Sequence, residues 1–147
     1  MKTVVVLGTS RDDSYTLQAV KDHCPFNNYD LVDLRKLNIG YYSYNHNING
    51  ADDFTEIAVN MVAADNIIFA TPVYWYAMSG VLKVFFDRFS ELLSTHKPLG
   101  KALKGKTTYL IATGADAALP PGFEVPFKLT SEYFEMSYAG AFYSMTR

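Results

Sequence analysis

The chain has 147 residues and a formal net charge of −2; 49% of its residues are hydrophobic and 19% are charged. This composition is ample for a hydrophobic core and argues against an intrinsically disordered chain, while the small net charge gives no basic surface for nucleic acid. The length predicts one domain over residues 1–147.

The first half of the chain follows the patterns of a strand, a helix, a second strand and a loop in turn. The run TVVVLG is β-branched and ends at Gly8, as expected of a buried strand. Leu17, Val20 and Cys24 recur three and four residues apart, which predicts one apolar helix face. A weaker strand and a segment rich in Asn, Gly and Tyr follow. The four segments are residues 3–8, 14–24, 29–34 and 38–50.

The second half repeats the alternation with stronger signals. Apolar residues recur at helical spacing from Met78 to Leu93, the best helical stripe of the sequence. The basic segment KPLGKALKGK, residues 97–106, is interpreted as a solvated loop rather than a binding patch. The predicted helices cover residues 52–64, residues 78–93 and part of residues 120–136, and the predicted strands cover residues 66–71, 107–114 and 139–145.

The alternation of helices with continuous apolar strands predicts a parallel sheet, because crossover helices cover the faces of such a sheet. Five strands fit the flavodoxin-like order 2-1-3-4-5, an α/β fold with helices on both faces. A doubly wound domain of this kind usually ends with a helix, and too few residues follow the last predicted strand to form one. We therefore expect the C-terminal helix to be absent.

Without that helix, the sheet face shared with the first helix is expected to be partly uncovered. Two explanations stay open. A second copy of the chain covers the face, which predicts a homodimer or a higher homo-oligomer, or the chain is shortened and its other helices spread over the gap.

Cys24 is the only cysteine, so no internal disulfide forms, as is usual in a reducing compartment. The chain enters its first strand without a signal-peptide pattern, and the apolar stretch from Ile67 to Leu82 is interrupted by Pro72 and Gly80. These features predict a cytoplasmic protein that has neither a membrane nor a nucleic acid as its partner.

Ligands of open parallel sheets bind where the strand order reverses, here in the loops after the first and third strands. The first loop, GTSRDDSYT at residues 8–16, combines hydroxyl groups with Arg11 and a helix start, which suits a phosphate monoester. The hydroxyl groups belong to Thr9, Ser10, Ser14 and Thr16. Alternatively, Ser14 or Asp13 only caps the helix. Asp12 and Asp13 would repel a dianion unless they point away.

Other classes of phosphate or metal site lack their motifs here. The sequence has no GxxxxGK[ST] and no GxGxxG. A phosphorelay receiver needs an acidic residue where Thr71 and Pro72 stand, and a cysteine-based phosphatase needs its cysteine in the first loop. The histidines have no metal-ligand spacing, so we expect no metal site. They are His23, His46 and His96.

The loop after the third strand, TPVYWYAMSG at residues 71–80, is unusually apolar for a surface loop. Pro72 and Val73 end the strand, and three aromatic residues follow them. Beside a phosphate site, these aromatics favour a flat, largely apolar ligand tethered by a phosphate group. The three aromatics are Tyr74, Trp75 and Tyr76. The alternative is that Trp75 and Tyr76 pack under neighbouring loops or in a subunit interface.

At these residues the sequence resembles the NADPH-dependent FMN reductase family of flavodoxin-like proteins. The family's first-loop pattern, roughly G-S-x-R-x-x-S-x-T, corresponds to residues 8–16. Its second pattern, P-x-Y followed by S/G-x-L-K-x-F-x-D-R, corresponds to residues 72–88. Two departures are Asp12, where relatives often have a basic residue, and the missing last helix.

The resemblance implies which residues meet FMN. The phosphate would be held by Ser10, Arg11, Ser14 and Thr16, with Tyr15 in the same loop. The ring system would lie against Pro72, Val73, Tyr74, Trp75 and Tyr76, with its other edge at Gly114 and Ala115 in the loop ATGADA. Three residues of the second pattern look structural, namely Lys83, Asp87 and Arg88.

The implied activity is an oxidoreductase that takes hydride from NAD(P)H and passes electrons to a quinone, a free flavin or a similar small-molecule acceptor. A non-enzymatic FMN electron carrier like flavodoxin is the alternative, although such carriers are commonly more acidic than this chain and their phosphate loops typically lack an arginine. A relative that has lost FMN is a third possibility. No side chain is expected to act as a catalytic acid or base.

Overall fold

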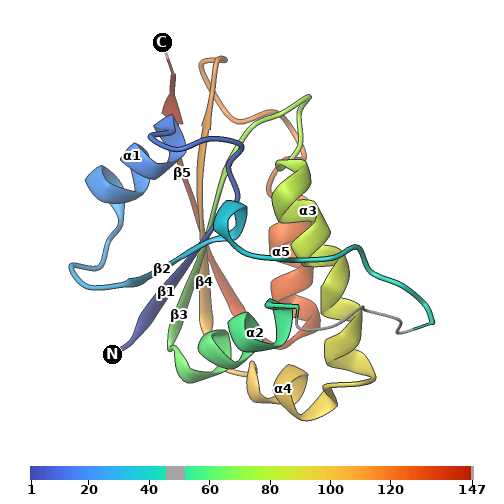
Figure 1. Cartoon of the computed structure of the whole chain (residues 1–147). Coiled ribbons are helices and arrows are strands. Elements are labelled where there is room, and N and C mark those ends of the chain that lie inside the picture. The colour runs from blue at the N-terminus through green and yellow to red at the C-terminus, as the bar shows by residue number, and fades with distance from the viewer. Residues whose placement is uncertain (46–51, 147) are drawn as a thin grey trace.

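The computed structural model describes residues 1–45 and 52–146. Five parallel strands form one twisted sheet in the order β2-β1-β3-β4-β5 (Figure 1). The strands are β1 (Thr3–Leu7), β2 (Asp30–Asp33), β3 (Asn66–Pro72), β4 (Thr107–Gly114) and β5 (Ser137–Met145). This is the flavodoxin-like order predicted from the sequence, and the prediction is confirmed.

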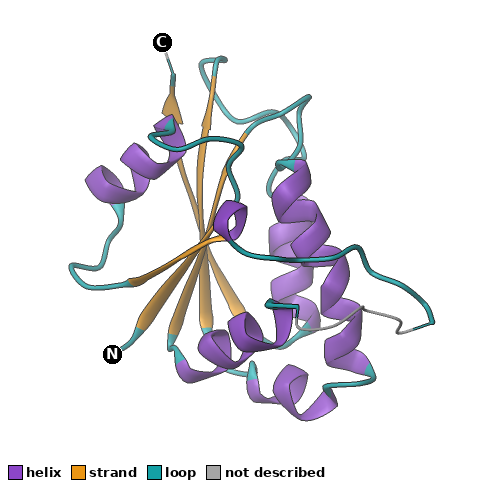
Figure 2. Cartoon of the chain, viewed as in Figure 1, coloured by secondary structure: helices purple, strands orange, loops and turns teal. Residues whose placement is uncertain are grey.

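Helices pack on both faces of the sheet (Figure 2). The α-helices are α1 (Tyr15–His23), α2 (Phe54–Ala63), α3 (Gly80–Asp87), α4 (Lys97–Ala102) and α5 (Val125–Tyr133); the 3-10 helices are η1 (Leu34–Lys36) and η2 (Arg88–Leu93). The connection through α1 moves across the sheet in one direction, and those through α2, α3 and α5 move in the other. Because such crossovers are right-handed, α1 lies on one face and the other three lie opposite.

The two faces bury cores of different size. The larger core, on the side of α2, α3 and α5, is dominated by phenylalanine rings. Rings of Phe54, Phe69, Phe85, Phe86, Phe89 and Phe127 contact one another there. The smaller core lies between α1 and the sheet and includes Val5, Leu7, Val20, Ile68 and Ile111. Alternate residues of β1 thus enter opposite cores, as the pleat of a strand requires.

The face of the sheet toward α1 is covered only in part. Phe142 of β5 pairs in register with Ile111 and stacks on His23, with 4.1 Å between the ring centroids, yet its side chain stays 37% exposed. Within residues 1–45 and 52–146, α1 is the only helix on this face. None of the helices in these residues is long and apolar enough to cross a membrane.

Two sequence expectations need correction. Residues 97–106 were expected to form a solvated loop, but α4 occupies Lys97–Ala102. Pro98 favours a helix start, and Gly100 packs so closely that a Cβ there would lie 2.1 Å from the carbonyl oxygen of Leu92. The helix expected over residues 78–93 begins at Gly80 and becomes 3-10 at Arg88. The loop expected over residues 38–50 has neither helix nor strand through residue 45, and its remainder lies outside the described residues.

Arg88 is the first residue of η2, at the point where α3 ends. Its side chain is 2% exposed and donates to Asp52 Oδ2 at 2.9 Å, to the Gly40 carbonyl oxygen at 2.9 Å and to Glu91 Oε1 at 3.1 Å. The guanidinium also lies over the Phe54 ring, 4.8 Å from its centroid. A buried arginine with two carboxylates joins η2 to the segment before α2. That placement is structural, as the sequence pattern indicated.

Candidate functional site

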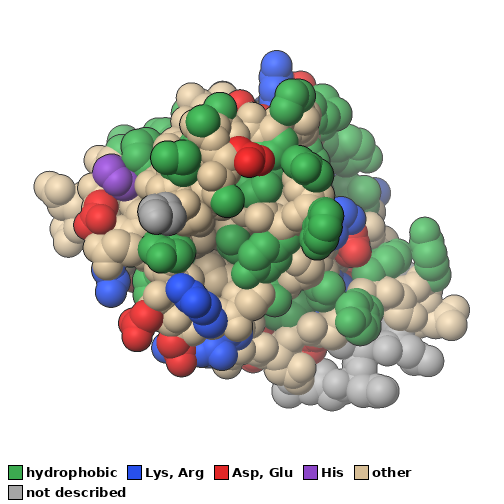
Figure 3. Space-filling view, turned by 90° about the horizontal axis from the view of Figure 1, so that it is seen from above, with side chains coloured by type: hydrophobic (Ala, Val, Ile, Leu, Met, Phe, Trp, Pro, Cys, Tyr) green, Lys and Arg blue, Asp and Glu red, His purple; other side chains and the backbone are tan. Residues whose placement is uncertain are grey.

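A cavity of about 340 Å³ opens at the carboxyl ends of β1, β3 and β4, where the strand order reverses. This volume is within the range of roughly 300–1,000 Å³ that is usual for small-molecule sites. Its lining residues are Thr9, Ser10, Arg11, Ser14, Tyr15, Thr16, Pro72, Val73, Tyr74, Thr113, Gly114, Ala115 and Thr146. Figure 3 looks down on this edge of the sheet: hydrophobic side chains cover much of it, and several Lys and Arg side chains gather to one side.

The loop after β1 is anchored to the start of α3. The Gly8 amide donates to the Ala70 carbonyl oxygen at 2.9 Å, and the Ser79 hydroxyl donates to the Gly8 carbonyl oxygen at 2.7 Å. A Cβ at Gly8 would lie 2.7 Å from the Cβ of Leu82, so only glycine allows this approach. The same Ser79 hydroxyl accepts from the Leu82 amide and caps α3. Ser79 therefore fixes the two predicted ligand loops relative to each other.

Hydroxyl groups of the first loop are mostly engaged within the protein. Ser14 caps α1 by accepting from the Leu17 amide at 3.0 Å, which is the capping alternative foreseen for this residue. The Thr9 hydroxyl donates to the Arg11 carbonyl oxygen at 3.0 Å, and the Thr16 hydroxyl lies 2.7 Å from that of Thr113. The capping hydroxyl of Ser14 keeps its own proton to donate. The first amides of α1 have no partner inside the helix and lie at the same end.

Asp12 is directed toward η1. Its carboxylate pairs with the guanidinium of Arg35, and the hydrogen bond and the positive charge of Arg35 together lower the pKa of Asp12. Neither Asp12 nor Asp13 lines the cavity. Asp13 adopts a left-handed backbone with φ of 45° immediately before the cap of α1. The repulsion between these carboxylates and a bound dianion, a concern raised by the sequence, is therefore reduced by their placement.

The loop after β3 turns sharply at two aromatic residues. Tyr74 and Ala77 exchange backbone hydrogen bonds of 2.9 and 3.1 Å, and the residues between them, Trp75 and Tyr76, have φ of 51° and 69°. Two left-handed residues at the centre of a hairpin are typical of a type I′ turn, which usually contains Asn or Gly. The turn presents Trp75 to solvent with 93% of its side chain exposed. Tyr74 lines the cavity, whereas Trp75 and Tyr76 stand outside it.

The third wall of the cavity is the end of β4 with its loop. The Val73 amide donates to the Thr113 carbonyl oxygen at 2.7 Å, and the Thr146 amide donates to the Gly114 carbonyl oxygen at 2.7 Å. A Cβ at Gly114 would lie 2.9 Å from the Tyr143 hydroxyl oxygen and 3.2 Å from the Cβ of Val73. Glycine at position 114 therefore lets the ends of three strands meet behind the cavity.

Most residues predicted for the site meet around this cavity, with Trp75 and Tyr76 outside it. Sequence reasoning missed Thr113 and Thr146 as lining residues; Thr9, counted among the hydroxyls of the first loop but not among the residues that the resemblance assigns to FMN, also lines the cavity. Thr113 lies directly before Gly114 and Ala115, which were predicted for the site, so its place in the sequence was the signal that could have identified it. Thr146 follows the last strand, and only the pairing of β5 with β4 brings it to the cavity.

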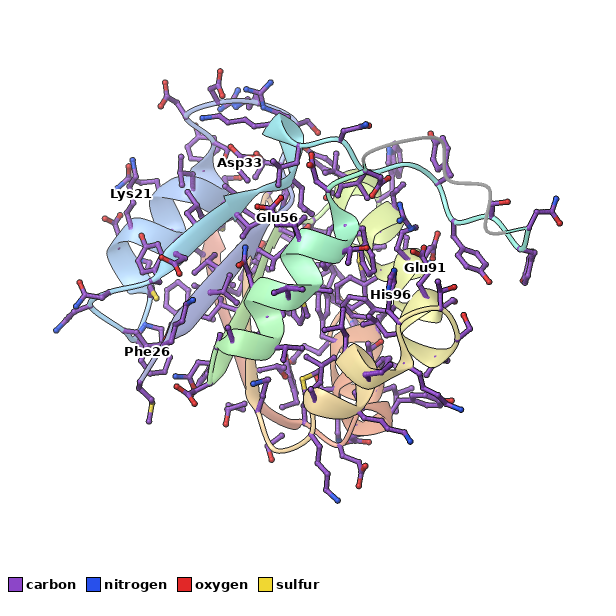
Figure 4. The ribbon with its side chains drawn as sticks, turned by 60° about the horizontal axis from the view of Figure 1, so that its bottom comes forward. Lys21, Phe26, Asp33, Glu56, Glu91 and His96 are labelled. Carbon is purple, nitrogen blue, oxygen red and sulfur yellow. The ribbon has the colours of Figure 1, made fainter. Side chains whose placement is uncertain are left out.

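Two other hollows share no lining residue with this cavity. A hollow of about 700 Å³ lies among the loop containing Tyr41, η2 and α5. Another, of about 420 Å³, lies beside the edge strand β2, where Figure 4 shows Asp33 and Glu56 on its rim. The residues that the structure describes contain no group of three His, Cys, Asp or Glu side chains able to hold a metal ion.

The sequence profile of the NADPH-dependent FMN reductase family matches residues 1–121. A Bacillus subtilis protein provisionally named an NAD(P)H-dependent FMN-containing oxidoreductase is 33% identical over 93 residues, which cover 60% of this chain and 51% of the relative. An NADPH azoreductase from Bacillus sp. strain OY1-2 is 30% identical over 99 residues, 67% of this chain and 56% of the relative. The chain thus spans about half the length of these curated relatives.

A solved structure from Bacillus subtilis, the Trp repressor binding protein, is similar to this chain over nearly its whole length. The TM-score is 0.79 at 25% sequence identity, and the match covers 99% of this chain and 85% of the other. The likeness extends through β5, beyond the residues that the family profile matches.

Proposed function

The chain belongs to the NADPH-dependent FMN reductase family, and on this basis we propose that it is an FMN-dependent oxidoreductase that takes reducing equivalents from NAD(P)H. Its second substrate is a small-molecule electron acceptor such as a quinone, a free flavin or an azo compound. The azo compound is included because one relative is named an NADPH azoreductase. The observation that carries the proposal is a single cavity that joins the first loop, with its hydroxyl groups and Arg11, to an apolar wall.

The residues of the cavity fit FMN at both ends. The end of the cavity that would receive the phosphate has the exposed side chains of Ser10 and Arg11 beside the first amides of α1, and all three features favour a phosphate. The apolar end has Pro72, Val73 and Tyr74 on one side and Gly114 on the other. Gly114 presents backbone without a side chain, which suits the flat edge of a ring system.

The chain's own residues would bind, orient and shield the cofactor. FMN, when bound, supplies hydride acceptance and electron transfer by its own chemistry. Arg11 would pair with the phosphate, and its guanidinium is steadied by Tyr15, whose ring centroid lies 5.7 Å away. The wall around Tyr74 would hold the ring and exclude water from one face. We assign no side chain as a catalytic acid or base.

Trp75 and Tyr76 are proposed to act at the mouth of the site. Their exposure and their left-handed backbone place two rigid aromatic side chains on a turn that begins at a cavity-lining residue. Strained backbone of this kind is often kept where function requires it. We propose that these rings contact the incoming NAD(P)H, the acceptor or a second copy of the chain.

Two further features belong to this proposal. The partly covered sheet face around Phe142 supports a homodimer or a higher homo-oligomer. The single cysteine, Cys24, supports a reducing, cytoplasmic location. Light scattering at micromolar concentration tests the first point, and a monomer would contradict it.

The test of the proposed function is an anaerobic titration. The purified protein is loaded with FMN, freed of excess cofactor, and mixed with NADPH or NADH while the visible spectrum is recorded. Bleaching of the flavin band followed by recovery on addition of a quinone supports the reductase. A flavin that binds but stays oxidised indicates an electron carrier. Failure to bind FMN would exclude both functions.

A further inference from the structure

The loop after β4 receives a hydrogen bond from one side chain of β5. Residues 115–119 leave the sheet after Gly114 and form the far rim of the cavity through Ala115. The hydroxyl of Tyr143 donates to the Asp116 carbonyl oxygen at 2.6 Å. Within residues 1–45 and 52–146, this is the one hydrogen bond that reaches residues 115–119 from elsewhere in the chain. Apart from this bond, the loop is held by Gly114 at its start and by Leu119 at its end, where Leu119 packs against the larger core.

Tyr143 approaches the loop from behind the cavity. It comes from β5, packs its ring against the larger core, and does not line the cavity itself. Its hydroxyl oxygen would lie 2.9 Å from a Cβ at position 114, so the absence of that Cβ is what admits the hydroxyl. Burial, with the negative charge of Asp116, raises the pKa of Tyr143, so the phenol keeps the proton that it donates.

From this geometry we propose that Tyr143 is a positioning residue for cofactor binding, which holds the loop of residues 115–119 against the edge of the bound flavin ring. The inference rests on the proposed function, because it assumes that this cavity holds FMN. It assigns a role to a residue that lies beyond the family profile, on a strand that sequence motifs did not connect with the site. Tyr143 acts through Gly114 and Ala115 rather than by touching the reacting atoms.

The same strand offers a matched control. The hydroxyl of Tyr138 donates to Glu124 Oε1 at 2.7 Å, and the ring of Tyr138 also packs against the larger core. Tyr138 pairs in register with Thr108, near the start of β4, whereas Tyr143 pairs with Ala112, near its end. The two substitutions Tyr143→Phe and Tyr138→Phe therefore each remove one phenolic hydrogen bond from β5. Only the first of these bonds reaches the cavity rim.

The experiment compares both variants with the wild-type protein by three measurements. These are fluorescence titrations with FMN and with riboflavin, the visible absorption spectrum of the bound flavin, and the thermal midpoint of the apoprotein. Riboflavin has the ring but not the phosphate, so it separates the two ends of the site.

Tyr143→Phe is expected to raise the Kd for FMN and for riboflavin by the same factor, roughly three- to tenfold, as expected for one lost hydrogen bond. It should also change the shape of the bound flavin's visible band. Tyr138→Phe and Tyr143→Phe are expected to lower the thermal midpoint of the apoprotein by similar amounts, since each loses one hydrogen bond. For Tyr138→Phe, both Kd values should stay within about twofold of wild type.

Three outcomes would overturn the inference. The first is wild-type binding by Tyr143→Phe, and the second is equal weakening by both variants, which would indicate a merely structural role. The third is weakening for FMN alone, which would place the effect at the phosphate. Failure of the wild-type protein to bind FMN is a separate result, since it removes the proposed function and this inference with it.

Discussion

The hydroxyl groups of Thr16 and Thr113 lie 2.7 Å apart in the floor of the cavity and join the first turn of α1 to the end of β4. Both residues are almost completely buried, with 1% and 2% of their surfaces exposed. This bond crosses the switch point of the sheet, where no backbone ladder connects β1 to β4. It therefore sets the spacing between the proposed phosphate loop and the proposed ring edge.

Replacing Thr113 by valine, which has nearly the same shape, leaves the Thr16 hydroxyl buried without this partner. We expect the free energy of unfolding in urea to fall by roughly 1–3 kcal/mol, the usual cost of such an unsatisfied group. Thr16→Val should cost a similar amount. The double variant should lose less than the sum of the two, because no orphaned hydroxyl remains. Strict additivity would show that the two hydroxyls do not interact.

Asp12→Asn removes the carboxylate that neutralises Arg35 at the edge of the first loop. The freed guanidinium should strengthen attraction of the dianionic FMN phosphate, tightening FMN by roughly two- to fivefold at low salt and less at high ionic strength. Titrations with FMN and riboflavin at two salt concentrations measure this effect. Riboflavin, which has no phosphate, serves as the control. An equal gain for riboflavin would show that the change acts on loop shape rather than on charge.

Tyr76→Gly relieves a left-handed backbone that costs a non-glycine residue roughly 1–2 kcal/mol. After allowance for the greater freedom of glycine in the unfolded chain, we expect a net gain in unfolding free energy of about 0.5–1 kcal/mol. Turnover with a quinone should fall if the ring contacts the substrates. Tyr74→Gly is the control, since Tyr74 is outside the left-handed region and should only lose stability. A loss of stability in Tyr76→Gly would contradict the claim that the left-handed backbone at position 76 is strained.

Asp52 gives the fold a defined acid sensitivity. Its burial alone would raise its pKa, but hydrogen bonds from Arg88, Gly40 and Phe54 outweigh this and lower the pKa below the ordinary value of an aspartate. Because the folded-state pKa is the lower one, the contribution to stability is fully present above the unfolded pKa. That contribution is lost as the pH falls from about 4 through the folded pKa.

The measurement is the free energy of unfolding in urea at pH 7, 4 and 3. Asp52→Asn should lower it by roughly 1–3 kcal/mol at pH 7 and should flatten its decline below pH 4. Asp30→Asn removes the exposed carboxylate that lies 3.7 Å from Lys2 Nζ and should change it by less than about 1 kcal/mol. An unchanged acid profile in Asp52→Asn would refute the assignment.

The fold was largely predictable because its signals are local. Apolar runs such as that before Gly8 identify the strands, and the single reversal of strand order identifies the edge where ligands bind. The helix α4 was not predictable from local propensity, because Gly100 is unfavourable within a helix. Glycine is required at this position by the close contact with Leu92. The buried position of Arg88 was not predictable either, since its partners Gly40 and Asp52 are distant in the sequence.

The site was predictable as a set of loops but not as a set of contacts. Motifs near Ser10 and Pro72 indicated the two loops that line the cavity, because their residue types are unusual for their positions. The partners of Thr16 and of Ser79 were not predictable, since each hydrogen bond joins segments separated by many residues. Tyr143 had no signal at all, because its position beside Gly114 follows from the pairing of β5 with β4.

The central claim is that this cavity holds FMN with its phosphate on the first loop. It is tested most directly by measuring the Kd of FMN and of riboflavin for the wild-type protein and for Arg11→Gln. We expect FMN to bind the wild-type protein more tightly than riboflavin, and Arg11→Gln to weaken FMN by roughly ten- to a hundredfold while riboflavin is unchanged. Equal affinity of FMN and riboflavin for the wild-type protein, or equal weakening of both by Arg11→Gln, would contradict the claim.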